Sequence, residues 1–347
     1  MSKSAHSRSR PIRIVALGGG TGLSMLLRGL KQHIASSRQN GEQWPIADIA
    51  AVVTVTDDGG SSGRLRREYS ILPPGDIRNC MVALSPDEAL LGRLFQYRFP
   101  AASGSGRGLS GHSFGNLFLT ALTQVTGDFP EAVRLSGKVL ATRGRIFPST
   151  NANVTLEAEL ADGRVVAGET KISRSRRRIR RVRLVPSGAR PLPEVLHAIR
   201  EADLILLGPG SLYTSIVPSL LVHGVANAIL RSRAQCAYIA NLMTQPGETD
   251  GYSVADHVRA IYDHTRVGLF DWVVVNRAPA SSPALLRRYR GEGAEPVDPS
   301  LDELRRMGLK YVTGDLLQQD GVVRHDQKRL ARLLLRHFAE GARSRNG

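Results

Sequence analysis

The stretch IRIVALGGGTG, residues 12–22, decides the fold. Its first half is a mostly apolar, partly β-branched run, and the glycines follow directly. Apolar residues then recur at the spacing of one helix face between Leu23 and Ile34. This order predicts a strand, a glycine turn and a helix.

Glycines in that position let backbone amides approach a phosphate, and the helix dipole favours its negative charge. The loop is not a Walker loop, because no Gly-Lys-Ser/Thr follows. It is not a regular GxGxxG fingerprint either, because Leu23 stands where the third glycine belongs. A tight turn without a ligand is the alternative. The phosphate contacts that we predict here are Gly19, Gly20, Thr21 and Gly22.

A second apolar run, residues 46–56, leads into DDGGSSGR, residues 57–64. Two carboxylates at the end of a buried strand repel each other unless a polar or cationic group compensates them. A ribose diol or a divalent metal would do so, and the following glycines and serines can form an anion-binding nest. A structural role for Asp58, capping the next element, is the alternative. The ligand contacts that we predict here are Asp57, Asp58, Gly60, Ser61 and Ser62.

Four further loops combine glycines with hydrogen-bonding side chains: PPGDIRN (73–79), GHSFGN (111–116), GPGSLYTS (208–215) and NLMTQPG (241–247). Asp76 can have a purely structural role as a helix N-cap, without contacting a ligand. His112 suits hydrogen bonding better than catalysis, and no other residue stands out as a catalyst. The remaining predicted contacts are Asn79, His112, Asn116, Gly208, Gly210, Ser211, Thr214, Asn241 and Gln245.

Strand and helix patterns alternate along most of the chain with short turns between them. We therefore predict an α/β fold, a Rossmann-like parallel sheet with helices on both faces. Loops that close the strands of such a sheet meet in one crevice at the strand carboxyl ends. Residues 12–150 would form the N-terminal, nucleotide-binding part of the domain and residues 190–340 its C-terminal part. Residues 1–11 are expected to be a disordered basic tail.

Residues 151–189 depart from the alternation. A strand pattern over 153–160, an Asp162-Gly163 turn and a second strand pattern over 164–172 predict a small β-hairpin insertion. The arginine run 174–183 continues from it, and we expect an exposed edge strand there. Residues 164–183 hold nine basic side chains and one acidic one, a net charge of +8 out of +16 for the chain.

Composition narrows the class of protein. The basic excess favours anionic partners. Aromatic residues are only 5%, and no nucleic-acid recognition module is visible, which argues against a specific nucleic-acid binder. Two isolated cysteines, no long apolar run and a polar start predict a cytoplasmic protein without disulfides, a zinc site or membrane insertion.

The loops together closely resemble the YvcK family, also called gluconeogenesis factors, over about residues 11–335. The strings that carry the likeness are GGGTGLS (18–24), VTVTDDGGSSGRLR (53–66), PPGDIRN (73–79), GHSFGNL (111–117), LGPGSLYTSI (207–216) and NLMTQPGETDGYSVADHV (241–258). That family is similar in fold to the CofD-like phospholactate transferases. By position, its phosphate loops fall on 19–22 and 208–215, and its aspartate pair falls on Asp57 and Asp58.

The resemblance implies a protein that binds a UDP-sugar such as UDP-N-acetylglucosamine and is needed for cell shape and wall synthesis on gluconeogenic carbon sources. It implies no established reaction and no required cofactor, and it allows a cell-wall-synthesis partner and a homo-oligomer. The second hypothesis is a CofD-like transferase of a phosphorylated group, with magnesium at Asp57 or Asp58. An NAD-type or nucleic-acid binder comes third.

Overall fold

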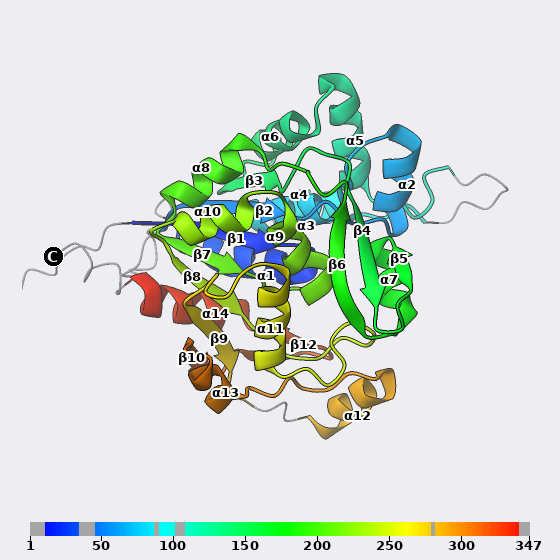
Figure 1. Ribbon diagram of the computed structural model, residues 1–347. Helices are drawn as coiled ribbons and strands as arrows, with labels where there is room; N and C mark the ends of the chain where they lie inside the picture. Colours follow the sequence, from blue (N-terminus) through cyan, green and yellow to red (C-terminus); the bar gives the residue numbers. More distant parts are fainter. Residues whose placement is uncertain (1–10, 35–45, 87–89, 101–107, 279–281, 340–347) are drawn as a thin grey trace, which may run out of the picture.

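Seven parallel strands form the central sheet of this computed structural model, in the order β10-β9-β8-β7-β1-β2-β3 (Figure 1). The structure describes residues 11–34, 46–86, 90–100, 108–278 and 282–339. The predicted tail therefore lies outside the described residues, except for Pro11. The strands are β1 (Ile12–Gly18), β2 (Ile46–Val53), β3 (Arg145–Pro148), β7 (Leu204–Leu207), β8 (Gln235–Ile239), β9 (Trp272–Asn276) and β10 (Lys310–Gly314).

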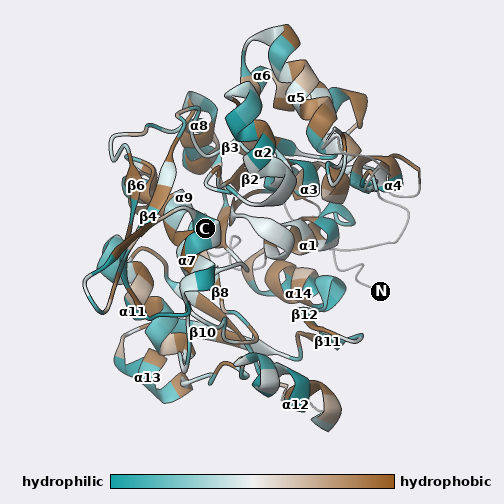
Figure 2. Cartoon of the chain, turned by 90° about the vertical axis from the view of Figure 1, so that its right-hand side faces the viewer, coloured by the Kyte–Doolittle hydropathy of each residue, from teal (hydrophilic) through white to brown (hydrophobic). Residues whose placement is uncertain are grey.

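Helices cover both faces of this sheet. Helices α1, α3 and α14 pack together on one face, and α8, α9 and α11 lie on the other, as Figure 2 shows. All four residues of β7 are buried, as expected for a parallel strand covered on both faces. The prediction of an α/β parallel sheet is confirmed.

The helices are α1 (Gly20–Lys31), α2 (Gly60–Tyr69), α3 (Gly75–Leu84), α4 (Leu91–Gln96), α5 (Phe114–Thr126), α6 (Phe129–Val139), α8 (Pro193–Glu201), α9 (Val217–Leu221), α10 (Val225–Arg231), α11 (Val254–His264), α12 (Pro283–Glu292), α13 (Leu301–Arg306) and α14 (Gln327–Leu334).

Strand β1 lies at the point where the order of the sheet reverses. It pairs with β2 on one side and with β7 on the other, so that Gly18 lies beside Val53 and Leu17 lies beside Leu207. The loops that follow these three strands therefore start next to one another. Ligands of doubly wound sheets bind at this kind of switch point.

Residues 151–189 hold a three-stranded antiparallel sheet, β5-β4-β6, with one short helix. The elements are β4 (Thr155–Leu160), β5 (Val165–Ala167), α7 (Glu169–Ser175) and β6 (Ile179–Val185). The predicted strand over 164–172 is wrong beyond Ala167, because Gly168 has a φ of +96° and turns the chain into α7. Strand β6 is an edge strand, and its Arg180, Arg181 and Arg183 are exposed.

Three features of the C-terminal half were not predicted. The segment 217–231 forms two short helices, α9 and α10, separated at Gly224, whose φ is +92°. Two π-helical turns, η2 (Leu212–Ile216) and η3 (Leu335–Ala339), adjoin α9 and α14. A hairpin of β11 (Leu317–Gln319) and β12 (Val323–His325) precedes α14.

In the described ranges no single helix has the length and apolar composition to cross a membrane. The bent pair Leu212–Leu221 and Val225–Arg231 meets both criteria only when the two pieces are taken together.

Candidate functional site

A cavity of about 420 Å³ lies where the loops after β1, β2, β7 and β8 meet. Helices α3 and α7 and the β11–β12 hairpin complete its wall. A cavity of about 690 Å³ between α8 and α10 contains none of these loops. The smaller cavity is lined by Gly19, Gly20, Thr21, Gly22, Met25, Asp57, Asp76, Glu169, Pro209, Gly210, Ser211, Ser215, Asn241, Leu242, Met243, Gln245, Val323, Arg324 and His325.

The cavity brings together half of the ligand contacts predicted from the sequence. The predicted residues that line it are Gly19, Gly20, Thr21, Gly22, Asp57, Gly210, Ser211, Asn241 and Gln245. The predicted residues outside its lining are Asp58, Gly60, Ser61, Ser62, Asn79, His112, Asn116, Gly208 and Thr214.

The first glycine loop packs directly on the loop after β7. A Cβ atom on Gly22 would lie 2.3 Å from the carbonyl oxygen of Pro209, so the close approach requires glycine. Gly20, the first residue of α1, has a φ of +63°, which also favours glycine. The two predicted phosphate loops are therefore one continuous surface of the cavity.

A carboxylate already lies on the first loop. The backbone N–H of Gly20 donates to Oδ2 of Asp76 at 2.7 Å. Asp76 is in the first turn of α3, whose N-cap is Pro74, so the interpretation of Asp76 as that N-cap is wrong. Its side chain instead satisfies the N-terminus of α1, which has no acidic residue in its own first turn.

Burial raises the pKa of Asp76 to about 6. The hydrogen bond from Gly20 opposes the rise, and the charge of Asp57 adds to it. Burial also raises the pKa of Glu169 well above its usual range, helped by Asp57 and Asp76. These cavity carboxyls can therefore take up protons near neutral pH, which lowers the repulsion that an anionic ligand would meet.

The two predicted aspartates face different partners. Asp57 lines the cavity and accepts a hydrogen bond from the backbone N–H of Gly59 at 2.9 Å. Oδ1 of Asp58 accepts bonds from the backbone N–H and hydroxyl of Thr170, at 2.9 and 2.6 Å. Asp58 thus holds the first turn of α7 beside the cavity, and α7 supplies Glu169 to the cavity wall.

Ser61 of α2 and two residues of the GHSFGN loop form a buried network outside the cavity lining. The Ser61 hydroxyl lies 2.9 Å from Nδ1 of His112, and Nδ2 of Asn116 donates to it at 3.1 Å. All three side chains are buried. This network links α2 to α5.

The part of the cavity wall formed by the loops after β7 and β8 offers uncharged hydrogen-bonding groups. Nε2 of Gln245 donates to the Ser211 hydroxyl at 2.7 Å, and Oε1 of Gln245 is buried without a partner. Glu248 lies behind this wall, where it accepts bonds from Ser173 and Thr214. Burial raises the pKa of Glu248 to about 7.

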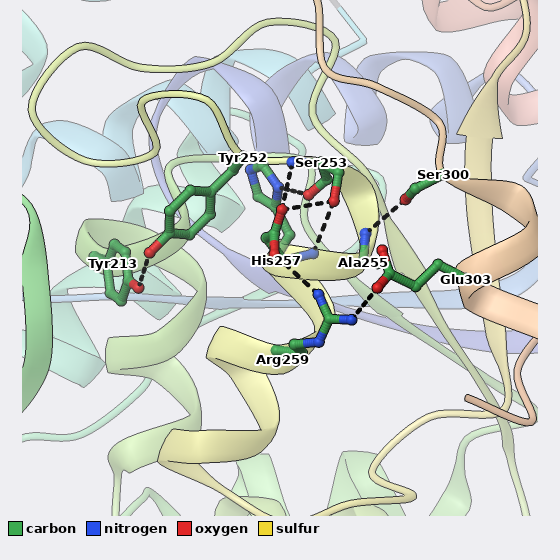
Figure 3. Close-up of polar contacts among 9 residues, drawn as sticks. Tyr213, Tyr252, Ser253, Ala255, His257, Arg259, Ser300 and Glu303 are labelled. Carbon is green, nitrogen blue, oxygen red and sulfur yellow. Dashed lines mark hydrogen bonds and ion pairs between the residues drawn. The ribbon is translucent and has the colours of Figure 1, made fainter. Parts of the chain in front are cut away.

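Figure 3 shows how the segment that leads into α11 is held. The hydroxyls of Tyr213 and Tyr252 lie 2.9 Å apart and join the loop after β7 to this segment. Ser253 caps α11 in a reciprocal capping box with Asp256. Arg259 pairs with Glu303, which ties α11 to α13. These contacts hold the loop after β7 and the segment before α11 together, which reduces the entropic cost of ordering them around a ligand.

Sequence reasoning missed several residues of the wall. Glu169 was assigned to a strand, and the hairpin that carries Arg324 and His325 was not predicted. Arg324 is an exposed cation at the cavity. Burial lowers the pKa of His325 to about 4, and its Nε2 has no partner, so a neutral imidazole faces the site. No periodic signal marks residues that reach a site from so far along the chain.

The comparisons with known proteins identify the family. The model of the family described as 2-phospho-L-lactate transferase CofD matches residues 14–317. The chain belongs to the CofD family. Within it, the chain is 49% identical to the gluconeogenesis factor of Bacillus subtilis strain 168 over 324 residues, which make up 93% of this chain and 97% of that protein.

Two further similar proteins extend the comparison. The putative gluconeogenesis factor of Nostoc sp. PCC 7120 is 49% identical over 340 residues, 96% of this chain and 70% of that protein. The crystal structure of protein BH3568 from Bacillus halodurans matches with a TM-score of 0.87 and 46% identity, and the match covers 94% of this chain and all of that one. The resemblance drawn from the loops is confirmed.

Proposed function

We propose that this protein binds a nucleotide sugar, with UDP-N-acetylglucosamine as the leading ligand, and acts as a regulatory protein of the gluconeogenesis factor type. The observation that carries the proposal is the meeting of the loops after β1, β2, β7 and β8 around one cavity of about 420 Å³. That volume lies within the range of about 300–1,000 Å³ that is usual for small-molecule sites.

Each part of such a ligand has suitable groups in the wall. The Gly19–Gly22 loop and Arg324 supply backbone amides and a cation for a diphosphate. Carboxylates such as Asp57 accept hydrogen bonds from the hydroxyls of a ribose. Gln245 and Asn241 can donate to and accept from a base or a sugar, and the partnerless Oε1 of Gln245 needs a donor.

The biological setting is part of the same proposal. We place the protein in the cytoplasm, where it reports nucleotide-sugar supply to cell-wall synthesis and cell shape during growth on gluconeogenic carbon. The support is the name "gluconeogenesis factor" carried by its relatives. A cell-wall-synthesis protein is the partner that this role requires.

Transfer of a phosphorylated group is the second candidate function, because the matching family model describes a transferase. The residues fit a preformed magnesium site poorly. Asp57 faces the cavity, whereas Oδ1 of Asp58 is engaged by Thr170. In the part of the chain that the structure describes, no group of three or more His, Cys, Asp or Glu side chains is arranged to hold a metal ion. Binding therefore ranks above transfer.

Native mass spectrometry of the freshly purified full chain tests the proposal. A retained ligand with the mass of a UDP-sugar is expected, and addition of UDP-N-acetylglucosamine should convert the remaining protein to a one-to-one complex. Retention of NAD or of a deazaflavin, with no complex on addition of the UDP-sugar, would replace this function by another.

A further inference from the structure

Three arginines from separate elements meet at the segment 110–113, beside the cavity. Arg64 of α2 donates to the carbonyl oxygen of Ser110 at 2.6 Å, and Arg98, which follows α4, donates to that of Gly111 at 2.5 Å. Arg78 of α3 donates to the hydroxyl of Ser113 in the same segment. Three guanidinium groups thus contact the segment 110–113, and the nucleotide-sugar proposal does not use them.

No acidic side chain in the described ranges pairs directly with these arginines, although Asp76 and Asp57 act on Arg78 at longer range. Among the described residues, none of Arg64, Arg78 and Arg98 forms an ion pair with a carboxylate. Burial, followed by the charge of Arg64, lowers the pKa of His112 against the opposing charge of Glu68, so the imidazole favours its neutral form and adds no further positive charge. Guanidinium groups held together repel one another, and an anion between them relieves that repulsion.

Two helix N-termini add to the positive potential. Helix α2 has ten residues and begins at Gly60, and α5 has thirteen and begins at Phe114. Neither has an acidic residue in its first turn. Ser61 of α2 and His112, which precedes α5, are hydrogen-bonded to each other, so both termini lie at the arginine cluster.

Two buried polar atoms at the cluster lack a partner. They are Nε of Arg78, a donor, and Oδ1 of Asn116, whose side chain is 2% exposed. Buried polar atoms without a partner are uncommon in native structures, and an absent ligand is one explanation. A phosphate group that carries one proton offers both an acceptor and a donor.

We propose that Arg64, Arg78 and Arg98 form a second anion site, which takes the phosphate group of a small phosphorylated compound while the nucleotide sugar occupies the cavity. The two sites adjoin. The carboxylates whose charges act on Arg78 are Asp76 and Asp57, both in the cavity wall. The pairing of two ligands rests on the proposed function, whereas the anion site itself does not.

Inorganic phosphate is the probe for this site, titrated into the full chain in chloride buffer and followed by calorimetry. The test variant is Arg64→Gln with Arg98→Gln, which spares the more buried Arg78. The matched control is Arg67→Gln, because Arg67 lies on the same helix, carries the same charge and is exposed. The titration is repeated with UDP-N-acetylglucosamine present, and melting temperatures show whether each variant is folded.

We expect wild type to bind phosphate at millimolar concentration and to bind it equally well beside the nucleotide sugar. The double variant should bind phosphate about ten-fold more weakly, as for lost charge-assisted bonds, and Arg67→Gln should match wild type. Unchanged phosphate binding in a folded double variant, or displacement of phosphate by the nucleotide sugar, overturns the proposal. If the nucleotide sugar fails to bind, only the proposed function falls, and the comparison of variants in phosphate still decides the second site.

Discussion

Proton uptake on ligand binding follows from the carboxyl that lies on the first glycine loop. Asp76 accepts the Gly20 N–H at 2.7 Å, and its pKa is about 6. A diphosphate on the same loop would repel the ionised form and accept a hydrogen bond from the neutral form, so binding raises this pKa further. Affinity for the nucleotide sugar should therefore fall as the pH rises above 6.

The magnitude follows from that pKa. Free Asp76 is about half protonated at pH 6 and about 1% protonated at pH 8, so affinity falls by at most about 50-fold over this range. The same sign holds for stability. A carboxyl whose pKa is raised by folding stabilises the protein below its unfolded pKa, and this contribution is lost as the pH rises through about 6.

Calorimetry at pH 6, 7 and 8, in buffers with different ionisation enthalpies, measures both affinity and proton uptake. Asp76→Asn is the matched variant, because its amide oxygen can still accept the Gly20 N–H while the side chain stays neutral. This variant should lose most of the pH dependence. Affinity that is flat or rises with pH in wild type would refute the reasoning, and proton release would indicate a metal rather than a proton on these carboxyls.

Three further outcomes are expected. Gly22→Ala places a Cβ atom 2.3 Å from the Pro209 oxygen, so the two loops must separate by about 1 Å. We expect this variant to be less stable by about 1–3 kcal/mol and to bind the ligand clearly more weakly, as calorimetry would measure. Asp57→Asn should weaken binding by about 1–3 kcal/mol with an unchanged melting temperature, whereas Asp58→Asn should lower the melting temperature, because it loosens Thr170. Wild type with UDP-sugars and magnesium should yield no new product by mass spectrometry.

The controls for these outcomes come from the same loops. Thr21→Ala is the stability control for Gly22→Ala, because Thr21 is adjacent and exposed and its replacement adds no atom; since Thr21 lines the cavity, the control applies to melting temperature and not to affinity. A Gly22→Ala protein with wild-type affinity and stability would show that the two loops are not held together by close packing. Equal effects of the two aspartate variants on binding and melting would contradict their separate roles.

The sheet and the glycine loops could be predicted because their signals are local. An apolar run that ends in glycines fixes a strand and its turn within about ten residues, as residues 12–22 and 204–210 illustrate. Parallel strands then bring their carboxyl ends together without any need to know the packing. This is why the three loops after β1, β2 and β7 could be expected to meet.

The roles of individual acids could not be predicted, because they depend on distant partners. Asp76 acts on Gly20, 56 residues earlier, and Asp58 acts on Thr170, 112 residues later. Glu169 reaches the cavity only because Gly168 breaks the predicted strand. Arg324 lies on a hairpin whose strands have three residues each. Such strands are too short to show a periodic sequence pattern.

Calorimetric titration of the folded wild-type chain with UDP-N-acetylglucosamine at pH 6 to 7 tests the central claim most directly. The loops that meet at the cavity predict one site per chain with a micromolar dissociation constant, weakened in Asp57→Asn. Absence of saturable heat up to millimolar ligand, with the chain shown to be folded, would contradict the claim that this cavity binds a nucleotide sugar.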